Sequence, residues 1–307
     1  MKWISAQELA RVAPYKDIIE ALRQGFRSEI KTPVRHHHDT SDVTTLLLMP
    51  AWGKDFTGLK TVTVKTDNPG LGVPTVQGTY LLIDNGTGTP VAIMDGTELT
   101  RRRTAAASAL ASDYLSREDS STLLLIGAGA LGAHFVRANA AVRPIKTVLI
   151  HNRTTQKSEA LAAELRLEGF AARIVTDLEA AMAEADIICG VTSSTQAIIR
   201  GDWLKPGTHI DLAGAFKPTM RETDAEAVGR SRVYVDTREG AAAEAGDLIQ
   251  AQAEGRFEFD RVQGDLFELS RGTKLGRKSK SEITLFKSCG TALEDLATAI
   301  MVHLRQV

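Results

Sequence analysis

The stretch from Thr122 to Val235 alternates short apolar runs with longer, alanine-rich segments. Each run is nearly all apolar and is bounded by turn residues, which is typical of strands that helices cover on both faces. Strands separated by helical segments of about 10 to 15 residues form βαβ units on a parallel sheet. We therefore predict a doubly wound, Rossmann-type α/β domain with strands at Thr122–Ile126, Thr147–His151, Ala171–Val175, Asp186–Val191, His209–Leu212 and Arg232–Val235.

A glycine-rich turn follows the first of these strands directly, and a helix is expected to begin near Ala130. In a dinucleotide-binding turn the first glycine permits the tight bend, the second lets the backbone approach the pyrophosphate, and the third lets the helix pack on the strand. The N–H groups at the helix N-terminus lack partners within the helix and attract phosphate. We therefore predict a dinucleotide site formed by Gly127, Gly129, Ala130, Leu131 and Gly132.

The end of the second strand bears on which dinucleotide binds. Enzymes that use NAD usually place Asp or Glu about 20 residues after the glycine turn, where it binds the ribose 2′-hydroxyl. Here the strand ends in His151-Asn152-Arg153-Thr154, and no acid stands there. A guanidinium at Arg153, together with Lys157, is suited to a 2′-phosphate. NADP(H) is therefore the preferred cofactor, contacted by Asn152, Arg153, Thr154 and Lys157, and NAD(H) is the alternative if Arg153 is only a surface residue.

Small hydroxyl residues follow the fourth strand at Thr192-Ser193-Ser194. Ligands of open α/β sheets bind at the carboxyl ends of the strands, so we expect Thr192 and Ser193 to line the nicotinamide half of the cofactor site. Ser and Thr are equally common as helix N-caps. The sequence leaves both interpretations open.

The first 117 residues follow a different pattern. The Gly- and Asn-rich segment from Asp84 to Pro90 separates two strand-like runs and predicts a hairpin. Two further strand-like runs precede it, which indicates an antiparallel sheet. The four expected strands are Leu46–Met49, Leu59–Lys65, Tyr80–Asp84 and Val91–Asp95.

Two helices complete this part of the chain. Leu99–Leu115 contains no Gly or Pro and is expected to be helical, with Thr97 or Thr100 as its cap. Apolar residues at helical spacing predict a second helix over Cys289–Leu304. We therefore predict an α+β domain at residues 1–117, completed by 287–307, and a dinucleotide-binding domain at 118–286.

Composition excludes several classes of protein. Lys plus Arg is 37 against 38 for Asp plus Glu, so the formal net charge is −1, whereas nucleic-acid binders carry an excess of positive charge. No run approaches the roughly 20 apolar residues that span a bilayer, and charge appears too early for a signal peptide. We expect a cytoplasmic protein with no nucleic-acid or membrane partner. Its two cysteines, Cys189 and Cys289, are not expected to form a disulfide.

Several motifs resemble the ornithine cyclodeaminase and μ-crystallin family. The resemblance covers most of the chain, and the spacing of the motifs carries it more than any single match. The motifs are Thr57-Gly-Leu-Lys60, Val73-Pro-Thr75-Val-Gln77-Gly78, Leu99-Thr-Arg-Arg-Arg103-Thr104-Ala-Ala, the glycine turn, Gly214-Ala-Phe-Lys-Pro218, Met220-Arg-Glu-Thr-Asp224, Glu244-Ala-Gly-Asp247 and Ser288-Cys-Gly290.

The resemblance implies roles for individual residues. Lys60 resembles the family's catalytic lysine, and Arg103 and Arg35 resemble the arginines that hold the substrate carboxylate. The resemblance also implies that Thr75, Thr104 and Ser288 contact the cofactor, and that Arg103 contacts the cofactor in addition to the substrate. Glu244 and Cys289 are implied near the substrate.

These residue types suit the chemistry of an imino or amino acid. An arginine fork matches a carboxylate geometrically. A lysine between cationic neighbours has a lowered pKa and can exchange protons near neutral pH. By contrast, three adjacent histidines, His36-His37-His38, cannot all face one point in a strand, so we interpret them as an exposed segment and expect no metal site.

One position departs from part of the family. Cyclodeaminases, and the related archaeal alanine dehydrogenases, carry an Asp two residues before the proline that matches Pro218, and here that position is Phe216. An aromatic side chain cannot transfer a proton, so oxidative deamination loses its expected base. Reduction of a preformed cyclic imine needs only a hydride and one proton. The pattern, with Phe216 as an apolar wall for the ring, resembles the ketimine-reductase branch.

The leading prediction is therefore an NAD(P)H-dependent reductase of Δ1-pyrroline-2-carboxylate, and also of Δ1-piperideine-2-carboxylate, that forms L-proline and L-pipecolate. One alternative is an ornithine cyclodeaminase or amino-acid dehydrogenase in which another acid replaces the missing Asp. The other is a crystallin-like protein that binds the nucleotide without turnover. The resemblance also implies a homodimer built through the sheet of the first domain, which would be a substrate-binding and dimerisation domain.

Overall fold

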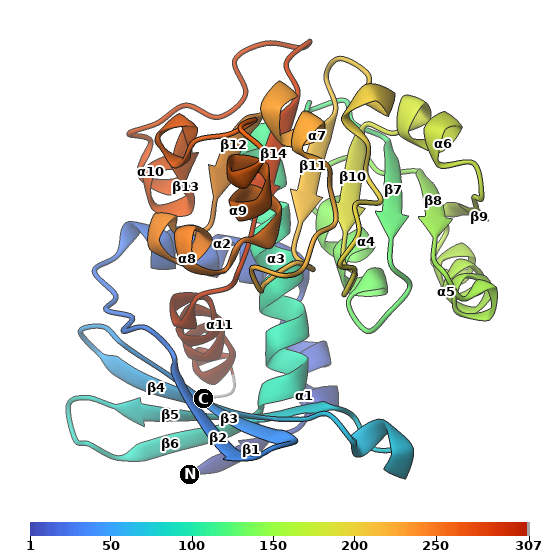
Figure 1. The fold of residues 1–307 in the computed structure, drawn as a ribbon. Coiled ribbons are helices and arrows are strands. Elements are labelled where there is room, and N and C mark those ends of the chain that lie inside the picture. Colours follow the sequence, from blue (N-terminus) through green and yellow to red (C-terminus); the bar gives the residue numbers. More distant parts are fainter. Residues whose placement is uncertain (306–307) are drawn as a thin grey trace. The chain divides into compact units, whose positions relative to one another are not determined.

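The computed structural model describes residues 1–305 (Figure 1). Two compact units make up the chain. The first unit contains Met1–Thr104 and the chain from Thr291 onward, and the second unit contains Ala105–Gly290. The first break falls inside helix α3 (Gly96–Leu115). The division into domains at 117/118 and 286/287 stays a prediction.

An eight-stranded sheet of wholly parallel pairs forms the centre of the second unit (Figure 1). The strand order is β13-β12-β14-β11-β10-β7-β8-β9. This confirms the predicted Rossmann-type α/β fold. The strands are β7 (Thr122–Ile126), β8 (Thr147–His151), β9 (Ala171–Ile174), β10 (Ile187–Gly190), β11 (His209–Leu212), β12 (Arg232–Val235), β13 (Gly264–Asp265) and β14 (Thr284–Lys287).

Helices alternate with these strands along the chain, as the βαβ pattern predicts. Their apolar residues and those of the strands form a continuous core that includes Leu124, Ile188 and Ile210. The helical segments are α4 (Gly132–Ala140), α5 (Thr155–Leu167), α6 (Leu178–Glu184), α7 (Ala225–Arg230), α8 (Arg238–Glu244), α9 (Gly246–Ala253) and α10 (Leu266–Arg271), with short 3-10 turns η2 (Gly201–Trp203) and η3 (Phe259–Arg261).

The six predicted strands of this sheet are confirmed, with ends that differ by at most one residue. Strands β13 and β14 were not predicted. Strand β14 inserts between β11 and β12, although it follows both in the chain. It ends in Lys287, and because lysine is seldom fully buried, the run does not resemble an interior strand in the sequence.

The glycine turn begins where expected, but its helix begins later. Gly127 has φ +113°, a conformation that favours glycine, and an added Cβ would lie 2.8 Å from the carbonyl oxygen of Val191. Helix α4 begins at Gly132 rather than near Ala130, because Ala130 and Leu131 form the last part of the turn. The start predicted near Ala130 was therefore wrong by two residues.

A six-stranded sheet in the order β1-β6-β5-β4-β3-β2 forms the first unit. Strands β2 to β6 pair antiparallel, and β1 joins β6 in parallel. The four predicted strands and the hairpin between β5 and β6 are confirmed. The strands are β1 (Lys2–Ile4), β2 (His36–Ser41), β3 (Thr44–Trp52), β4 (Phe56–Lys65), β5 (Val76–Asp84) and β6 (Pro90–Asp95).

Strands β1 and β2 were not predicted. Strand β2 contains His36, His37 and His38, and all six of its residues are exposed, which confirms the expected exposure of the histidines. The strand has no alternation of apolar and polar residues because neither of its faces is buried.

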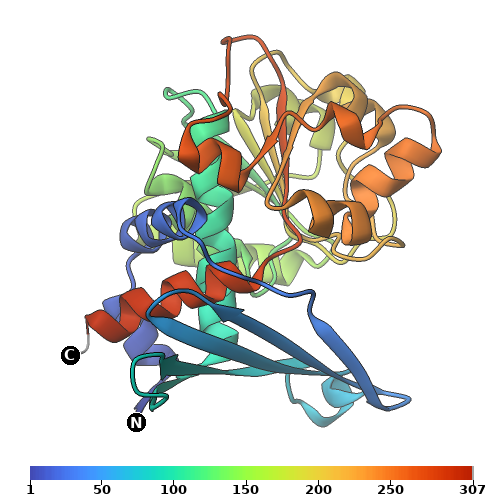
Figure 2. The ribbon, with the colours of Figure 1, turned by 90° about the vertical axis from the view of Figure 1, so that its left-hand side faces the viewer.

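One face of this sheet is covered by helices. Helix α11 (Ala292–Leu304) packs on β3, β4 and β5 and against α2 (Tyr15–Arg27), as Figures 1 and 2 both show. Within residues 1–305, Figure 2 shows no α-helix of the same unit over the opposite face. The remaining elements are α1 (Ala6–Val12) and η1 (Asn68–Leu71). Among residues 1–305, no helix has both the length and the apolar character that crossing a membrane requires.

Two helix starts differ from the prediction. Helix α3 begins at Gly96, and Asp95 Oδ1 accepts a hydrogen bond from the Glu98 N–H at 2.7 Å, so neither Thr97 nor Thr100 is its cap. Helix α11 begins at Ala292 rather than Cys289. Gly290 has φ +83°, which no right-handed helix accommodates.

Candidate functional site

Lys60 occupies the covered face of the first unit's sheet. In strand β4 it pairs with Met49 of β3 and Tyr80 of β5, and its side chain is only 2% exposed. Its Nζ lies 2.7 Å from Oδ2 of Asp295 on α11 and donates a longer hydrogen bond, 3.4 Å, to Thr100 Oγ1. The predicted proton-transfer lysine is therefore removed from bulk water and ion-paired.

Arg103 approaches the same carboxylate from helix α3. Its Nε donates to Asp295 Oδ1 at 3.0 Å, and its Nη1 donates to Glu294 Oε2. No residue between 1 and 305 accepts a hydrogen bond from its other terminal amine, Nη2. We refer to Lys60, Arg103, Glu294 and Asp295 as the buried ion cluster. Within this cluster, Arg103 Nη2 is the group that could bind an anion such as a carboxylate.

The cations of this cluster respond differently to burial. Burial and the charge of Arg103 lower the pKa of Lys60 to about 8, with a further contribution from Arg35, although Asp295 opposes them. Burial also disfavours the charge of Arg103, but the carboxylates of Asp295 and Glu294 outweigh it and raise the pKa of Arg103. Arg103 therefore stays charged, whereas Lys60 can exchange a proton near neutral pH.

Arg35 and Tyr80 lie close to the cluster. Arg35 directly precedes β2, is half-buried, and is near enough for its charge to act on Lys60. The structure thus brings together Lys60, Arg103 and Arg35, three of the six residues predicted at the substrate. Burial, followed by the charge of Asp295, raises the pKa of the Tyr80 hydroxyl well above its ordinary value.

The glycine of the Thr57-Gly-Leu-Lys60 motif has a steric role beside Lys60. A Cβ added to Gly58 would lie 1.9 Å from the Tyr80 hydroxyl oxygen. Tyr80 can therefore occupy this face of the sheet only because position 58 lacks a side chain. The other two candidates of this unit are less enclosed: Thr75 precedes β5 and Thr104 follows Arg103 in α3, and both are half-buried.

The residues predicted at the cofactor share one edge of the second unit's sheet. Gly127, Asn152 and Thr192 follow the carboxyl ends of β7, β8 and β10. Asn152 Oδ1 accepts a hydrogen bond from the Ala128 N–H at 3.1 Å, which ties the end of β8 to the glycine turn. Arg153, Thr154 and Lys157 are exposed beside them.

This edge fits a dinucleotide. A Cβ added at Gly129 would meet no atom within 4 Å, so the turn presents open backbone. Within residues 1–305 no side chain caps helix α4, and the N–H of Gly132 donates to the Gly129 carbonyl oxygen at 3.1 Å inside the turn. The N-terminal end of this helix favours phosphate through its dipole. Gly127, Gly129 and Gly132 would hold the pyrophosphate, and Asn152 and Arg153 would lie toward the adenosine ribose.

Thr192 is held by a buried carboxylate. Its N–H and Oγ1 donate to Glu222 Oε1 at 2.6 and 2.9 Å, and the N–H of Gly214 donates to Glu222 Oε2 at 2.7 Å. No helix begins at Thr192, Ser193 or Ser194, so the alternative of a helix N-cap is wrong. Glu222 instead joins the loop after β10 to the loop after β11, which carries Phe216 with 45% of its side chain exposed.

Asp236 organises the segment after β14 in a similar way. Its Oδ2 accepts hydrogen bonds from Ser288 Oγ at 3.1 Å, Cys289 N–H at 2.7 Å and Gly290 N–H at 2.6 Å. Ser288 is buried, whereas Cys289 and Glu244, the last residue of α8, are half-buried. The structure thus places Ser288 and Cys289 on a tightly held turn.

Sequence reasoning missed four acids of these arrangements: Glu222, Asp236, Glu294 and Asp295. One signal for two of them was present. Glu294 and Asp295 interrupt a mostly apolar helix, and charged residues in such a helix indicate buried partners. Glu222 and Asp236 give no such signal, because acids are common in loops.

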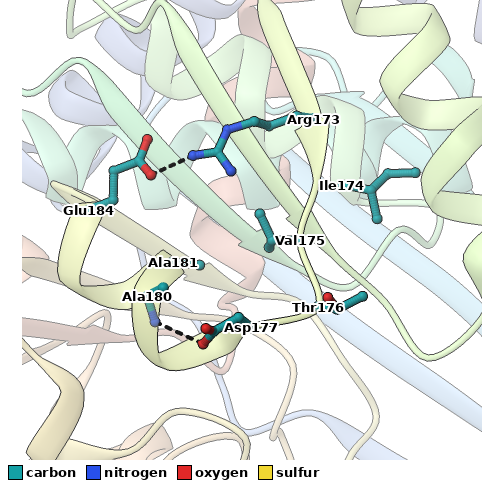
Figure 3. Close-up of a pocket in the computed structure, with 8 residues that line it drawn as sticks. All are labelled: Arg173, Ile174, Val175, Thr176, Asp177, Ala180, Ala181 and Glu184. Atoms are coloured by element: carbon teal, nitrogen blue, oxygen red, sulfur yellow. Dashed lines mark hydrogen bonds and ion pairs between the residues drawn. The ribbon is translucent and has the colours of Figure 1, made fainter.

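The described part of the chain also contains a hollow of about 240 Å³ between β9 and α6 (Figure 3). Its wall includes Arg173, which donates to Glu184, and Asp177, which accepts from the Ala180 N–H at 3.0 Å and caps α6. None of the candidate residues lines it. The candidate site therefore does not coincide with this hollow.

Comparisons with known proteins agree on one family. The pattern of the Ornithine cyclodeaminase/mu-crystallin family matches residues 4–307. A Delta(1)-pyrroline-2-carboxylate reductase of Paracoccus denitrificans (strain Pd 1222) is 39% identical over 93% of this chain and 90% of its own length. Both matches extend over both units.

Solved structures agree as well. Delta(1)-pyrroline-2-carboxylate reductase of Thermococcus litoralis, solved in complex with NADH and L-proline, superimposes with a TM-score of 0.94 and 32% identity over 99% of this chain and 97% of its own. An archaeal alanine dehydrogenase dimer with bound NAD superimposes with a TM-score of 0.92 and 29% identity, over 99% and 95% of the two chains.

Proposed function

Since the chain belongs to the ornithine cyclodeaminase/mu-crystallin family, we propose that it reduces Δ1-pyrroline-2-carboxylate, and also Δ1-piperideine-2-carboxylate, to L-proline and L-pipecolate. The predicted class, an oxidoreductase, is confirmed by relatives that are named reductases of this imine. The single observation that carries the choice of substrate is the buried ion cluster. It combines a lysine whose pKa is about 8 with an arginine that has one terminal amine unengaged by residues 1–305.

The cluster suits a ring that bears a carboxylate beside an imine nitrogen. Arg103 Nη2 and the guanidinium of Arg35 would hold the carboxylate, since arginine is suited to carboxylate recognition. Lys60 would donate a proton to the ring nitrogen from Nζ. Its pKa of about 8 keeps it mostly protonated at neutral pH and still able to release the proton.

When bound, a reduced nicotinamide would supply the hydride for the new C–H bond at the imine carbon. As the C=N double bond becomes single, its electron pair moves to nitrogen, which takes the proton from Lys60. Lys60 then regains a proton from water. No base is required, which agrees with Phe216 in place of the acid on which deamination depends.

We expect NADP(H) to be the preferred cofactor and NAD(H) to be accepted. Arg153 and Lys157 are exposed at the carboxyl end of β8, and the structure shows no acid at that strand end, between His151 and Thr154. Replacement of Arg153 by serine should raise the KM for NADPH about ten-fold and leave that for NADH unchanged, since a charged hydrogen bond contributes about 1.5–3 kcal/mol. Arg173→Ser, a similarly exposed arginine at the neighbouring strand, is the control.

The open face of the first unit's sheet supports a homodimer. A row of apolar side chains crosses its outward face through Pro50, Leu59, Leu81, Ile93 and Trp3, and Trp3 is 57% exposed. The other outward residues of β4 include Thr57, Thr61 and Thr63, so the apolar part of the face is this row and its neighbours. An apolar sheet face of this kind indicates a protein interface. The apolar outward residues include Trp3, Leu48, Pro50, Trp52, Leu59, Leu81 and Ile93.

Light scattering tests this association. Leu81→Asp should convert a dimer to monomers, because the interface would bury an unpaired charge. Leu167→Asp, at an exposed leucine of the second unit, should leave the dimer intact. A monomeric parent protein would refute the proposed dimer.

Steady-state kinetics test the proposed reaction. The purified protein should consume NADPH or NADH when Δ1-pyrroline-2-carboxylate is added, measured by the absorbance of the reduced nicotinamide. Release of ammonia from L-ornithine with NAD+ would establish a cyclodeaminase instead. Binding of the nucleotide with no turnover of either substrate would establish a non-catalytic binding protein.

A further inference from the structure

Two consecutive acids in helix α11 lie in surroundings that ordinarily exclude charge. Glu294 and Asp295 are both 0% exposed and are flanked by the buried Leu293 and Leu296. Burial of a carboxylate is strongly unfavourable unless cations and hydrogen bonds compensate for it. The position of this pair therefore depends on the cations of the site.

The two acids have different partners. Glu294 Oε2 accepts from Arg103. Asp295 divides its two oxygens between the two cations, with Oδ1 3.0 Å from Arg103 Nε and Oδ2 2.7 Å from Lys60 Nζ. Asp295 thus joins the side chain expected to hold the carboxylate to the side chain expected to supply the proton.

We propose that Asp295 is the positioning residue for the proton transfer: it keeps Lys60 protonated and oriented, and it turns Arg103 so that Nη2 remains available to the substrate. The inference rests on the proposed reduction and extends it to a residue in the C-terminal helix. Asp295 acts through Lys60 and Arg103 and need not contact the substrate.

The other groups around Lys60 show why the carboxylate matters. Arg103 faces it from α3 and Arg35 from the segment before β2, and both charges disfavour a protonated lysine. Thr100 of α3 accepts a long hydrogen bond, and Tyr80 of β5 is its cross-strand neighbour. Asp295 favours the protonated form of Lys60 both by its charge and by its hydrogen bond. Without it, burial and two cations would remove the proton at a lower pH.

The pH dependence of kcat/KM for the imine tests this role. Activity of the parent protein should fall as pH rises through about 8, where Lys60 loses its proton. In Asp295→Asn that alkaline limb should move to lower pH by about 1 unit or more, the usual effect of an opposite charge within about 4–6 Å. Asp295→Glu retains the charge and should restore the limb.

Glu294→Gln is the matched control, because it removes a buried carboxylate that pairs with Arg103, whereas Lys60 Nζ lies 2.7 Å from Asp295. It should raise KM without moving the alkaline limb. An unmoved limb in Asp295→Asn, or an equal shift in Glu294→Gln, would overturn the proposal.

Nuclear magnetic resonance of the parent protein tests the same pairing without a variant that could fail to fold. With 15N-labelled lysine and 13C-labelled aspartate, the Asp295 carboxyl signal should shift as the Lys60 ammonium titrates, and independent titrations would refute the pairing. This readout requires no turnover. If the imine is not reduced, the proposed function fails while the pairing is still tested.

Discussion

Lys60 of the first unit and Lys287 of the second are both fully enclosed lysines next to an aspartate, yet the two sites have opposite effects on the ammonium group. Lys60 Nζ lies 2.7 Å from Asp295, and Lys287 Nζ lies 3.2 Å from Asp247. Burial and Arg103 lower the pKa of Lys60 to about 8. Burial disfavours the charge of Lys287 too, but Asp247 and Glu222 outweigh it and raise its pKa.

The difference lies in the balance of neighbouring charge. Lys60 and Arg103 share the carboxylate of Asp295. The positive charge of Arg103 therefore disfavours the protonated form of Lys60. Lys287 neutralises Asp247 and Glu222, which also accept hydrogen bonds from the backbone: Asp247 Oδ1 accepts from the N–H groups of Glu222 and Thr223, at 2.7 and 2.9 Å. A buried lysine among acids stabilises the fold, whereas a buried lysine among cations is prepared to release its proton.

Removal of Lys60 should have the largest effect on catalysis. Lys60→Met should lower kcat/KM for the imine by about 10³-fold, because general acid catalysis contributes 10²–10⁴-fold. Its free energy of unfolding should change little, since Asp295 keeps Arg103 as a partner. Steady-state kinetics and urea unfolding measure the two effects, and full activity of the variant would contradict the assignment.

Removal of Lys287 should have the reverse pattern. Lys287→Met leaves Asp247 and Glu222 buried without their cation, and breaking such a pair costs about 3–5 kcal/mol of stability. Turnover of the molecules that remain folded should stay within a few-fold of the parent. A Lys287→Met variant that is stable but inactive would show that Lys287 takes part in catalysis. The proposed difference between Lys60 and Lys287 would then be wrong.

A smaller effect, on the binding of NADH, is expected when Glu222, one of the two acids beside Lys287, is replaced by glutamine. In Glu222→Gln the amide NH₂ would face a backbone N–H of Thr192 or Gly214, and one or two hydrogen bonds would be lost. The loops after β10 and β11 would then be held less firmly. The Kd for NADH should therefore rise about ten-fold. Asp186→Asn is the matched control.

Asp186 also accepts from two backbone N–H groups, of Ser121 and Thr122, but these contacts lie at the amino ends of β7 and β10, whereas those of Glu222 lie beyond the carboxyl ends of β10 and β11. Its variant should be less stable and should bind NADH as the parent does. Equal Kd values for the two variants, measured by calorimetry, would show that Glu222 is only structural.

The two lysines should also contribute to the free energy of unfolding with opposite dependence on pH, which is the smallest of the expected effects. The pKa of Lys60 is about 8 in the folded chain against 10.5 ordinarily, so the unfolded state binds more protons over that interval and stability rises with pH there. The contribution of Lys287 has the opposite sign: it is present below 10.5 and is lost as pH rises through its raised pKa. Between pH 8 and 10, the parent should therefore gain stability relative to Lys60→Met, which urea unfolding at each pH measures.

Much of the fold was predictable because the relevant patterns are local. The strands around the glycine turn are short apolar runs, and Gly127, Gly129 and Gly132 carry their backbone requirements in their residue type. Helix ends were less predictable, since Asp95 rather than Thr97 caps α3 and Gly290 delays α11 until Ala292. Several residue types cap a helix well, and the packing of neighbouring segments decides among them.

The sequence by itself determined the glycine turn after β7, the motif that contains Lys60 and the position of Arg103, because each depends on spacing within a few residues. Only the tertiary structure decided which acids serve them. Asp295 meets Arg103 across 192 positions of sequence, and Glu222 meets Thr192 through a hydrogen bond between separate loops. A buried acid and a solvated one have the same side chain, and the packing around each determines its charge, its partners and its role.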